Sequence, residues 1–121
     1  MKNVLHLGLD VGSTTAKLVA LNSNDDIVYS RYQRHFSDIK NTILKLLKEI
    51  CDSLIHNEVT MMVTGSAGIA VSKWLELPFV QEVVASTTSI ERFIPRTDVA
   101  IELGGEDAKI TFLSGGVEQR M

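Results

Sequence analysis

The sequence predicts an α/β fold in which a three-stranded meander leads into further strands with helices, followed by the first hairpin of a second lobe. Three observations support this prediction. Three strand-length runs separated by short polar turns occupy residues 4–34. A run with helical periodicity occupies residues 36–54. A phrase of acid, glycine and lysine at residues 9–18 recurs at residues 101–110, which indicates a duplicated element.

The first hairpin joins a strand at 4–9 to a strand at 16–21 through a glycine turn that follows Asp10. Gly12 lets the backbone approach a ligand closely, and successive N–H groups in such a turn form an anion-binding concavity. Asp10 repels phosphate directly but is able to hold a Mg²⁺ ion that binds it. The turn also carries three hydroxyl donors: Ser13, Thr14 and Thr15. The sequence therefore predicts a phosphate-sized notch, with an ordinary hairpin tip as the alternative.

The chain then turns at the polar cluster 22–26 into an alternating run at 27–34, whose polarity indicates the edge of a sheet. From residue 36 to residue 54, apolar residues recur in steps of three and four and predict one amphipathic helix of about five turns. Ser37 is the predicted N-cap, with Asp38 in the first turn. Cys51 lies within this helix, where a semi-buried packing role is expected.

A short apolar run at 59–64 predicts another strand, which ends in Thr64-Gly65-Ser66-Ala67-Gly68 before a helix at 69–75. A helix N-terminus at the carboxyl end of a strand can bind an anion, and a plain tight turn explains the pattern equally well. Pro78 ends this helix. We expect a short strand at 79–83 and then a helix at 84–94, although its β-branched residues also favour a strand.

The second hairpin is predicted from strands at 99–103 and 109–113. Ile101-Glu102-Leu103-Gly104 aligns with Leu9-Asp10-Val11-Gly12, and Ala108-Lys109-Ile110 aligns with Ala16-Lys17-Leu18. Two such hairpins facing each other are expected to clamp a metal–nucleotide from both sides. The third strand after this hairpin has scarcely begun at residue 121. We therefore expect a piece of a longer protein, with a first lobe over 1–95 and the truncated start of a second lobe over 96–121.

Composition argues against several classes of protein. The net charge of −3 gives no basic surface, so nucleic acid is not an expected partner. The single cysteine permits no intramolecular disulfide, which fits a reducing compartment. No apolar stretch approaches the roughly 20 residues that span a bilayer. The histidines show no metal-ligand spacing: His6, His35 and His56. We expect a cytoplasmic protein that binds neither membrane nor nucleic acid.

The first hairpin, Gly8-Leu9-Asp10-Val11-Gly12-Ser13-Thr14-Thr15-Ala16-Lys17, resembles the first phosphate motif of the actin/Hsp70/sugar-kinase ATPase superfamily, whose lobes have a ribonuclease H-like fold. Within it, the chain most closely resembles the activators of 2-hydroxyacyl-CoA dehydratases and of benzoyl-CoA reductase. Glu102-Leu103-Gly104-Gly105-Glu106-Asp107-Ala108-Lys109 is similar to their second phosphate motif, D-I-G-G-Q-D-x-K. The order of strands and helices also agrees, so the resemblance covers nearly the whole chain.

The resemblance implies an actin-like ATPase that uses Mg²⁺ and ATP to drive a low-potential electron to a CoA-thioester dehydratase or reductase. It implies a homodimer with one [4Fe–4S] cluster between the subunits. Asp10 and Glu102 take the positions of metal-binding and catalytic acids, and Glu106 takes a further catalytic position. The implied nucleotide-binding residues are Gly12, Ser13, Thr14, Thr15, Lys17, Gly104 and Gly105.

Two residues depart from the motif. Glu102 replaces an aspartate and reaches one methylene farther. Glu106 replaces a glutamine and, when ionised, only accepts hydrogen bonds, so the position either does less or acts as a base. The family's cluster cysteines follow the second motif, and Cys51 does not match them, so a cluster is expected only in the longer parent chain. The fragment alone is expected to hydrolyse ATP negligibly. The alternatives are an actin-like sugar or carboxylate kinase, and a non-enzymatic actin-like scaffold or sensor.

Overall fold

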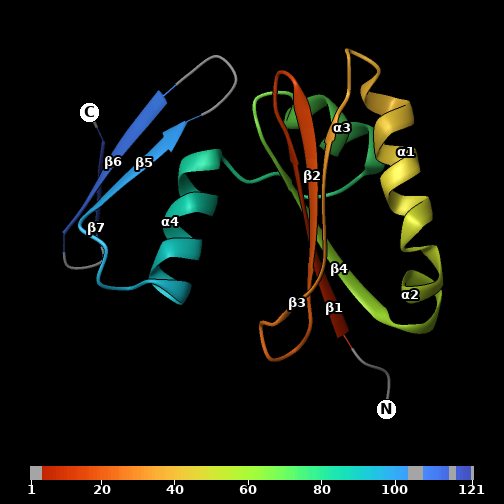
Figure 1. Cartoon of the computed structure of the whole chain (residues 1–121), viewed down its shortest axis with the longest axis horizontal. Helices are drawn as coiled ribbons and strands as arrows, with labels where there is room; N and C mark the ends of the chain where they lie inside the picture. The colour runs from red at the N-terminus through yellow and green to blue at the C-terminus, as the bar shows by residue number, and fades with distance from the viewer. Residues whose placement is uncertain (1–3, 104–107, 115–116, 121) are drawn as a thin grey trace. The chain divides into compact units, whose positions relative to one another are not determined.

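The structure is a computed structural model that describes residues 4–103, 108–114 and 117–120. The chain divides into two compact units, Met1–Phe79 and Val80–Met121 (Figure 1). Both combine helix and sheet, which confirms the predicted α/β class. The lobe boundary expected at residue 95 remains a prediction.

The first unit is built on a four-stranded sheet in the order β3-β2-β1-β4. An antiparallel meander forms from β1 (Val4–Val11), β2 (Thr15–Leu21) and β3 (Ile27–Arg34). The fourth strand, β4 (Glu58–Thr64), runs parallel to β1. The predicted meander is confirmed, and the polar alternating run is an edge strand as expected.

One face of this sheet carries the core. Alternate residues of the two central strands are almost fully buried, and Leu9 lies opposite Leu18 in the β1–β2 register. Helical and β4 side chains complete this cluster: Ile43, Leu46, Ile50, Val63 and Val71. The intervening residues project from the other side, which we call the open face. It includes His6, Gly8 and Asp10 of β1, because the side chains of a strand alternate.

The predicted single long helix is two helices, α1 (Ile39–Glu49) and α2 (Cys51–His56), which Figure 1 shows along one side of the sheet. The break falls at Ile50, whose N–H donates to Leu47 O at 3.3 Å while its side chain stays buried. The predicted start is also wrong. Phe36 and Ser37 have positive φ angles of 49° and 65°, and Asp38 is the N-cap, with no side-chain capping bond.

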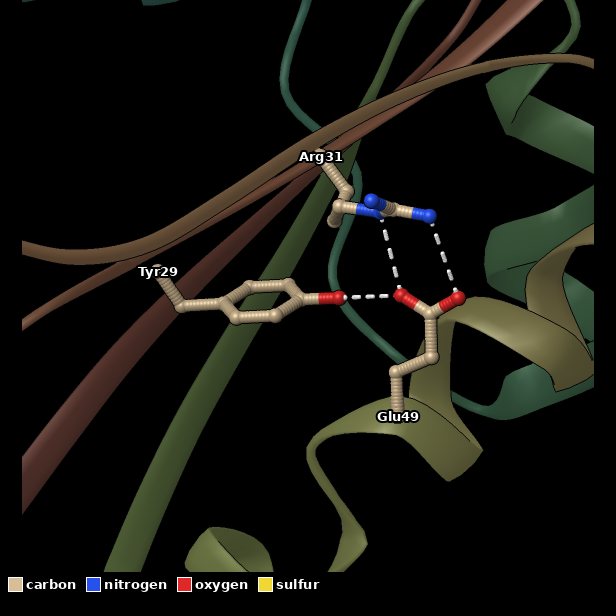
Figure 2. A network of polar contacts seen from close by, with 3 residues as sticks. All are labelled: Tyr29, Arg31 and Glu49. Carbon is tan, nitrogen blue, oxygen red and sulfur yellow. Dashed lines mark hydrogen bonds and ion pairs between the residues drawn. The ribbon is translucent and has the colours of Figure 1, made fainter.

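A polar network on the core side of the sheet fastens α1 to the edge strand (Figure 2). Glu49 accepts a 2.7 Å hydrogen bond from the Tyr29 hydroxyl. Its carboxylate also lies 3.1 Å from Arg31 Nε and accepts a 3.3 Å bond from Arg31 Nη2. Burial, followed by the bond to Glu49, raises the pKa of the Tyr29 phenol. The network ties β3 to the helix that covers the neighbouring strands.

The third helix, α3 (Gly68–Leu75), packs against β4 and β1. Gly68 allows this close approach, since a Cβ there would lie 3.0 Å from the Phe79 ring and 3.2 Å from Val63. The strand expected at 79–83 is wrong. Phe79 forms only an isolated parallel bridge with Val63, and the next helix already begins at Glu82.

The second unit consists of α4 (Glu82–Phe93) and a three-stranded antiparallel sheet in the order β5-β6-β7. Its strands are β5 (Val99–Leu103), β6 (Ala108–Ser114) and β7 (Val117–Arg120). The predicted second hairpin and the start of a third strand are both present. No helix in the described part of the chain is long and apolar enough to cross a membrane.

Candidate phosphate-binding site

Four residues form a cross-strand row on the open face, next to the β1–β2 turn. Asp10 is paired in register with Lys17 of β2 and with Thr64 of β4, and Lys17 is paired with Tyr32 of β3. Lys17 Nζ lies 3.9 Å from Asp10 Oδ2 and 5.6 Å from the centre of the Tyr32 ring. The side chains of Lys17 and Asp10 are 48% and 38% exposed, so this is a solvent-screened pair that a ligand can reach.

The turn at the end of this row leaves two amides available. Gly12 N–H donates to Thr15 O at 2.9 Å and closes the hairpin. Within the described part of the chain, the N–H groups of Ser13 and Thr14 have no hydrogen-bond partner. Ser13 is exposed and Thr14 is half-buried, whereas Thr15 is only 8% exposed. Two consecutive unpaired amides form a small anion-binding concavity.

Gly12 is not required by the backbone conformation. Its φ angle is not positive, and a Cβ built there would meet only Thr15 O, at an ordinary 3.7 Å. The fold would therefore accept alanine at this position. A glycine here leaves room beside the turn, and its role in binding a ligand stays a prediction.

Gly65 lies beside the row, and the sequence analysis placed it in the turn after the strand at 59–64 without connecting it to Asp10. It has a positive φ of 105°, and a Cβ there would lie 2.2 Å from Val11 O and 2.6 Å from Asp10 Oδ1. The end of β4 therefore approaches the Asp10 carboxylate as closely as a bare backbone allows. The signal in the sequence was the Thr-Gly pair that follows an apolar strand, but it does not say which carboxylate the glycine meets.

The hydroxyl of Thr64 is buried and has no hydrogen-bond partner among the described residues. Leaving a buried hydroxyl without a partner costs about 1–3 kcal/mol, so such an atom calls for an explanation. Its place beside Asp10 suits a bound water or a hydrated cation. One carboxylate is also a sufficient protein ligand for Mg²⁺, which keeps most of its waters and takes phosphate oxygens. The residues present thus fit a Mg²⁺–phosphate group.

Two amides of the turn after β4 are hydrogen-bonded. Ala67 N–H donates to Val11 O and Gly68 N–H donates to Gly65 O, each at 2.9 Å. The Ala67 amide therefore fastens this turn to β1, and the Gly68 amide closes the turn itself. An anion-binding role of this turn stays a prediction.

The acid–lysine pairing recurs in the second unit. Glu102 is paired in register with Lys109 across β5 and β6, just as Asp10 is paired with Lys17 across β1 and β2. The side chain of Glu102 and the tip residues Gly104, Gly105 and Glu106 lie outside what the structure describes. Their roles, and the clamp between the two hairpins, remain predictions.

No group of three or more histidine, cysteine or acidic side chains that could hold a metal ion occurs among the described residues. Cys51 is exposed and lies in α2, so the expected semi-buried packing role is wrong. The break at Ile50 accounts for this, because it ends the helical periodicity from which the role was inferred.

The fold is shared with several proteins of solved structure. The chain is similar to the activator of the 2-hydroxyisocaproyl-CoA dehydratase from Clostridium difficile, solved with bound ADPNP, at 25% identity and a TM-score of 0.76. It is similar in fold to component A of the (R)-2-hydroxyglutaryl-CoA dehydratase of Acidaminococcus fermentans, at 19% identity and a TM-score of 0.78. The Ppx/GppA protein of Aquifex aeolicus shares the fold at 11% identity and a TM-score of 0.62. The predicted actin-like lobe and the resemblance to the dehydratase activators are confirmed.

Each of these structural matches covers nearly all of this chain but at most about half of the other protein. The match to the Clostridium activator covers 96% of this chain and 46% of the activator. The match to component A covers 93% of this chain and 44% of component A. An uncharacterised protein of Methanocaldococcus jannaschii is 28% identical over 104 residues, which are 86% of this chain and 41% of that protein. No protein-family model matches the chain.

Proposed function

We propose that this chain is the first nucleotide-phosphate-binding part of an activase, an ATPase that drives a low-potential electron to a CoA-thioester dehydratase or reductase. One observation carries the proposal. The β1–β2 turn combines unpaired amides, a reachable carboxylate and a glycine that the backbone does not need. The likeness to an activator solved with bound ADPNP supports it.

Each residue has a physical task in this proposal. The amides of Ser13 and Thr14 bind phosphate oxygens, and Gly12 leaves space for them. Asp10 holds hydrated Mg²⁺ beside the Thr64 hydroxyl, and Lys17 offers a second positive charge. When bound, Mg²⁺ supplies charge neutralisation at the phosphates. Glu102, with Gly104 and Gly105, is proposed to contact the same triphosphate from the second hairpin, and Glu106 to act near the attacking water.

The partner and cofactor are proposed for the longer parent protein. The partner is the dehydratase or reductase component, and the intact activase is proposed to be a homodimer in the cytoplasm. A [4Fe–4S] cluster needs thiolates that a single cysteine does not supply, so the cluster belongs to the parent chain. The fragment alone is proposed to hydrolyse ATP negligibly, because most of the opposing lobe's contacts are expected to lie outside it.

The test is a titration of the chain with Mg²⁺ and ADPNP, in which nuclear magnetic resonance monitors the backbone amide signals of residues 12–15. We expect saturable shifts at Ser13 and Thr14 that require Mg²⁺. The variant Gly12→Ala should keep the wild-type melting temperature and lose at least about tenfold in affinity. The matched control is Gly8→Ala, because a Cβ at Gly8 meets nothing within 4 Å. It should bind as the wild type does.

Three outcomes contradict the proposal. The amides of the turn do not respond to the nucleotide, Gly12→Ala binds as tightly as Gly8→Ala, or Asp10→Asn leaves the Mg²⁺ dependence unchanged. A chain that folds normally and binds no nucleotide would instead favour the scaffold or sensor alternative.

A further inference from the structure

His35 makes three hydrogen bonds at the candidate site, and the sequence analysis missed it. The residue follows β3 directly and is 4% exposed. Its backbone N–H donates to Thr14 O at 3.0 Å. Its ring Nε2 lies 2.9 Å from Gly12 O, and its ring Nδ1 accepts the Ser37 N–H at 3.0 Å. A buried histidine therefore joins the end of the edge strand to the phosphate turn.

These contacts determine the tautomer of the ring. A carbonyl oxygen only accepts hydrogen bonds, so Nε2 must carry the proton that is donated to Gly12 O. Nδ1 must be bare, because it accepts a backbone N–H. The neutral Nε2–H form satisfies both contacts at once, and neither the other neutral tautomer nor the imidazolium does.

The local backbone is strained in a way that serves this arrangement. Phe36 and Ser37 both have positive φ angles, although neither is glycine and Phe36 is 74% exposed. Each such residue is disfavoured, and residues held this way persist where the surroundings require them. Here the left-handed turn brings the Ser37 N–H back onto the ring of His35. The strain and the bond to Nδ1 together hold the ring in place.

The chemical effect falls on two carbonyls of the turn, those of Gly12 and Thr14. Gly12 O and Thr14 O would repel a phosphate if they faced it, and His35 engages both of them. No backbone N–H in the described ranges donates to Gly12 O, so the imidazole is its partner. The amides of Ser13 and Thr14 are left unpaired. The turn thus has its Gly12 and Thr14 carbonyls occupied and its Ser13 and Thr14 N–H groups available, which is a polarity that suits an anion.

We propose that His35 is a positioning residue of this site, fixed as the Nε2–H tautomer, which sets the β1–β2 turn for phosphate. The identity of the ligand rests on the proposed function, whereas the tautomer and the ordering of the turn do not. His35 does not touch the phosphate. It acts through Gly12 and Thr14.

Two substitutions separate the two sides of the ring. In His35→Gln the amide nitrogen is as many bonds from Cα as Nε2 is, so it can still donate to Gly12 O. In His35→Asn the carbonyl oxygen corresponds to Nδ1, so the Ser37 bond can persist while the bond to Gly12 O is lost. Both variants lose the imidazole ring. The controls are His56→Gln and His56→Asn, at an exposed residue at the end of α2.

The experiment is nuclear magnetic resonance of the whole chain, first without ligand and then with Mg²⁺ and ADPNP. The ¹⁵N shifts of the His35 ring should report a protonated Nε2 and a bare Nδ1. His35→Asn should speed amide exchange at Gly12 and weaken ADPNP binding about tenfold or more. His35→Gln should stay close to the wild type in Gly12 amide exchange and in ADPNP affinity. This difference between His35→Gln and His35→Asn should hold even if the two variants have similarly reduced melting temperatures. The His56 variants should change nothing.

A different tautomer, or equal effects of His35→Gln and His35→Asn on Gly12 exchange, would overturn the inference. If the wild-type chain binds no ADPNP, the proposed function fails. The role of His35 is then still decided by the ring shifts and by amide exchange in the two variants.

Discussion

Replacing Gly65 by alanine should destabilise the first unit and displace the Asp10 carboxylate in the same step. The added Cβ would lie 2.2 Å from Val11 O and 2.6 Å from Asp10 Oδ1. The first of these atoms is backbone and cannot rotate away. The φ angle of 105° adds conformational strain, because residues with a Cβ rarely adopt it.

The magnitude follows from two terms. Holding a non-glycine residue in such a conformation costs about 1–3 kcal/mol. Forcing a methyl group into a well-packed site costs about 1–3 kcal/mol more. A loss of even about 2–3 kcal/mol lowers the melting temperature of a small domain by roughly 10–20 °C. A marginally stable unit of this size would be partly unfolded at physiological temperature.

The assay uses the single tryptophan, Trp74, which lies in α3 of the first unit. Its fluorescence reports the melting of that unit without a contribution from the other. Gly8→Ala is the matched control, since its Cβ meets nothing within 4 Å. Alanine also lowers the conformational entropy of the unfolded chain, which favours the folded state. The reasoning is refuted if Gly65→Ala melts within a few degrees of Gly8→Ala.

Two further predictions concern the contacts of α1, with stability measured by the same fluorescence melt. Glu49→Gln should lower the Tyr29 pKa, because the hydrogen bond and the charge of Glu49 both raise that pKa. The measurement is the phenolate absorbance as a function of pH, in a Tyr32→Phe background that leaves Tyr29 as the one tyrosine. The pKa of Tyr29 in the folded chain is raised above its unfolded value near 10, so the neutral phenol stabilises the folded state. This contribution to the free energy of unfolding is present below pH 10 and is lost as the pH rises through the folded-state pKa. The loss of stability at high pH should be smaller in Glu49→Gln. An unchanged Tyr29 titration would contradict the network in Figure 2. Leu46→Ala should cost about 2–5 kcal/mol, because Leu46 is fully buried, whereas Leu44→Ala on the exposed side of α1 should cost far less; equal losses would show that the burial of α1 is assigned wrongly.

Local patterns were enough to predict the hairpins. Strand, tight turn and strand lie next to each other in the sequence, so the cross-strand partner of Asp10 follows from the turn length. The amphipathic run was equally informative about which residues of α1 face the core. It did not reveal the break at Ile50, because Ile50 itself fits the apolar spacing. It did not reveal the start at Ile39, because Phe36 fits the same spacing and Ser37 is a typical N-cap residue, while both have a left-handed backbone.

The residues that the sequence analysis missed depend on contacts between distant parts of the chain. Gly65 meets Asp10 only because β4 pairs in parallel with β1, and a parallel pairing has no short turn to announce it. His35 meets Gly12 across 23 positions, through the end of the β2–β3 ladder. A lone histidine after a strand carries no pattern that distinguishes a positioning residue from a surface one.

The repeated hairpin is where sequence and structure support each other most directly. In each unit the acid pairs in register with the lysine, and the apolar residue before the acid pairs with the one after the lysine. Equal register means that the acid has the same cross-strand position relative to the lysine in both ladders. The side chains of Asp10 and Glu102 differ in length by one methylene. Because register is a property of each hairpin alone, this equivalence is independent of how the two units are arranged.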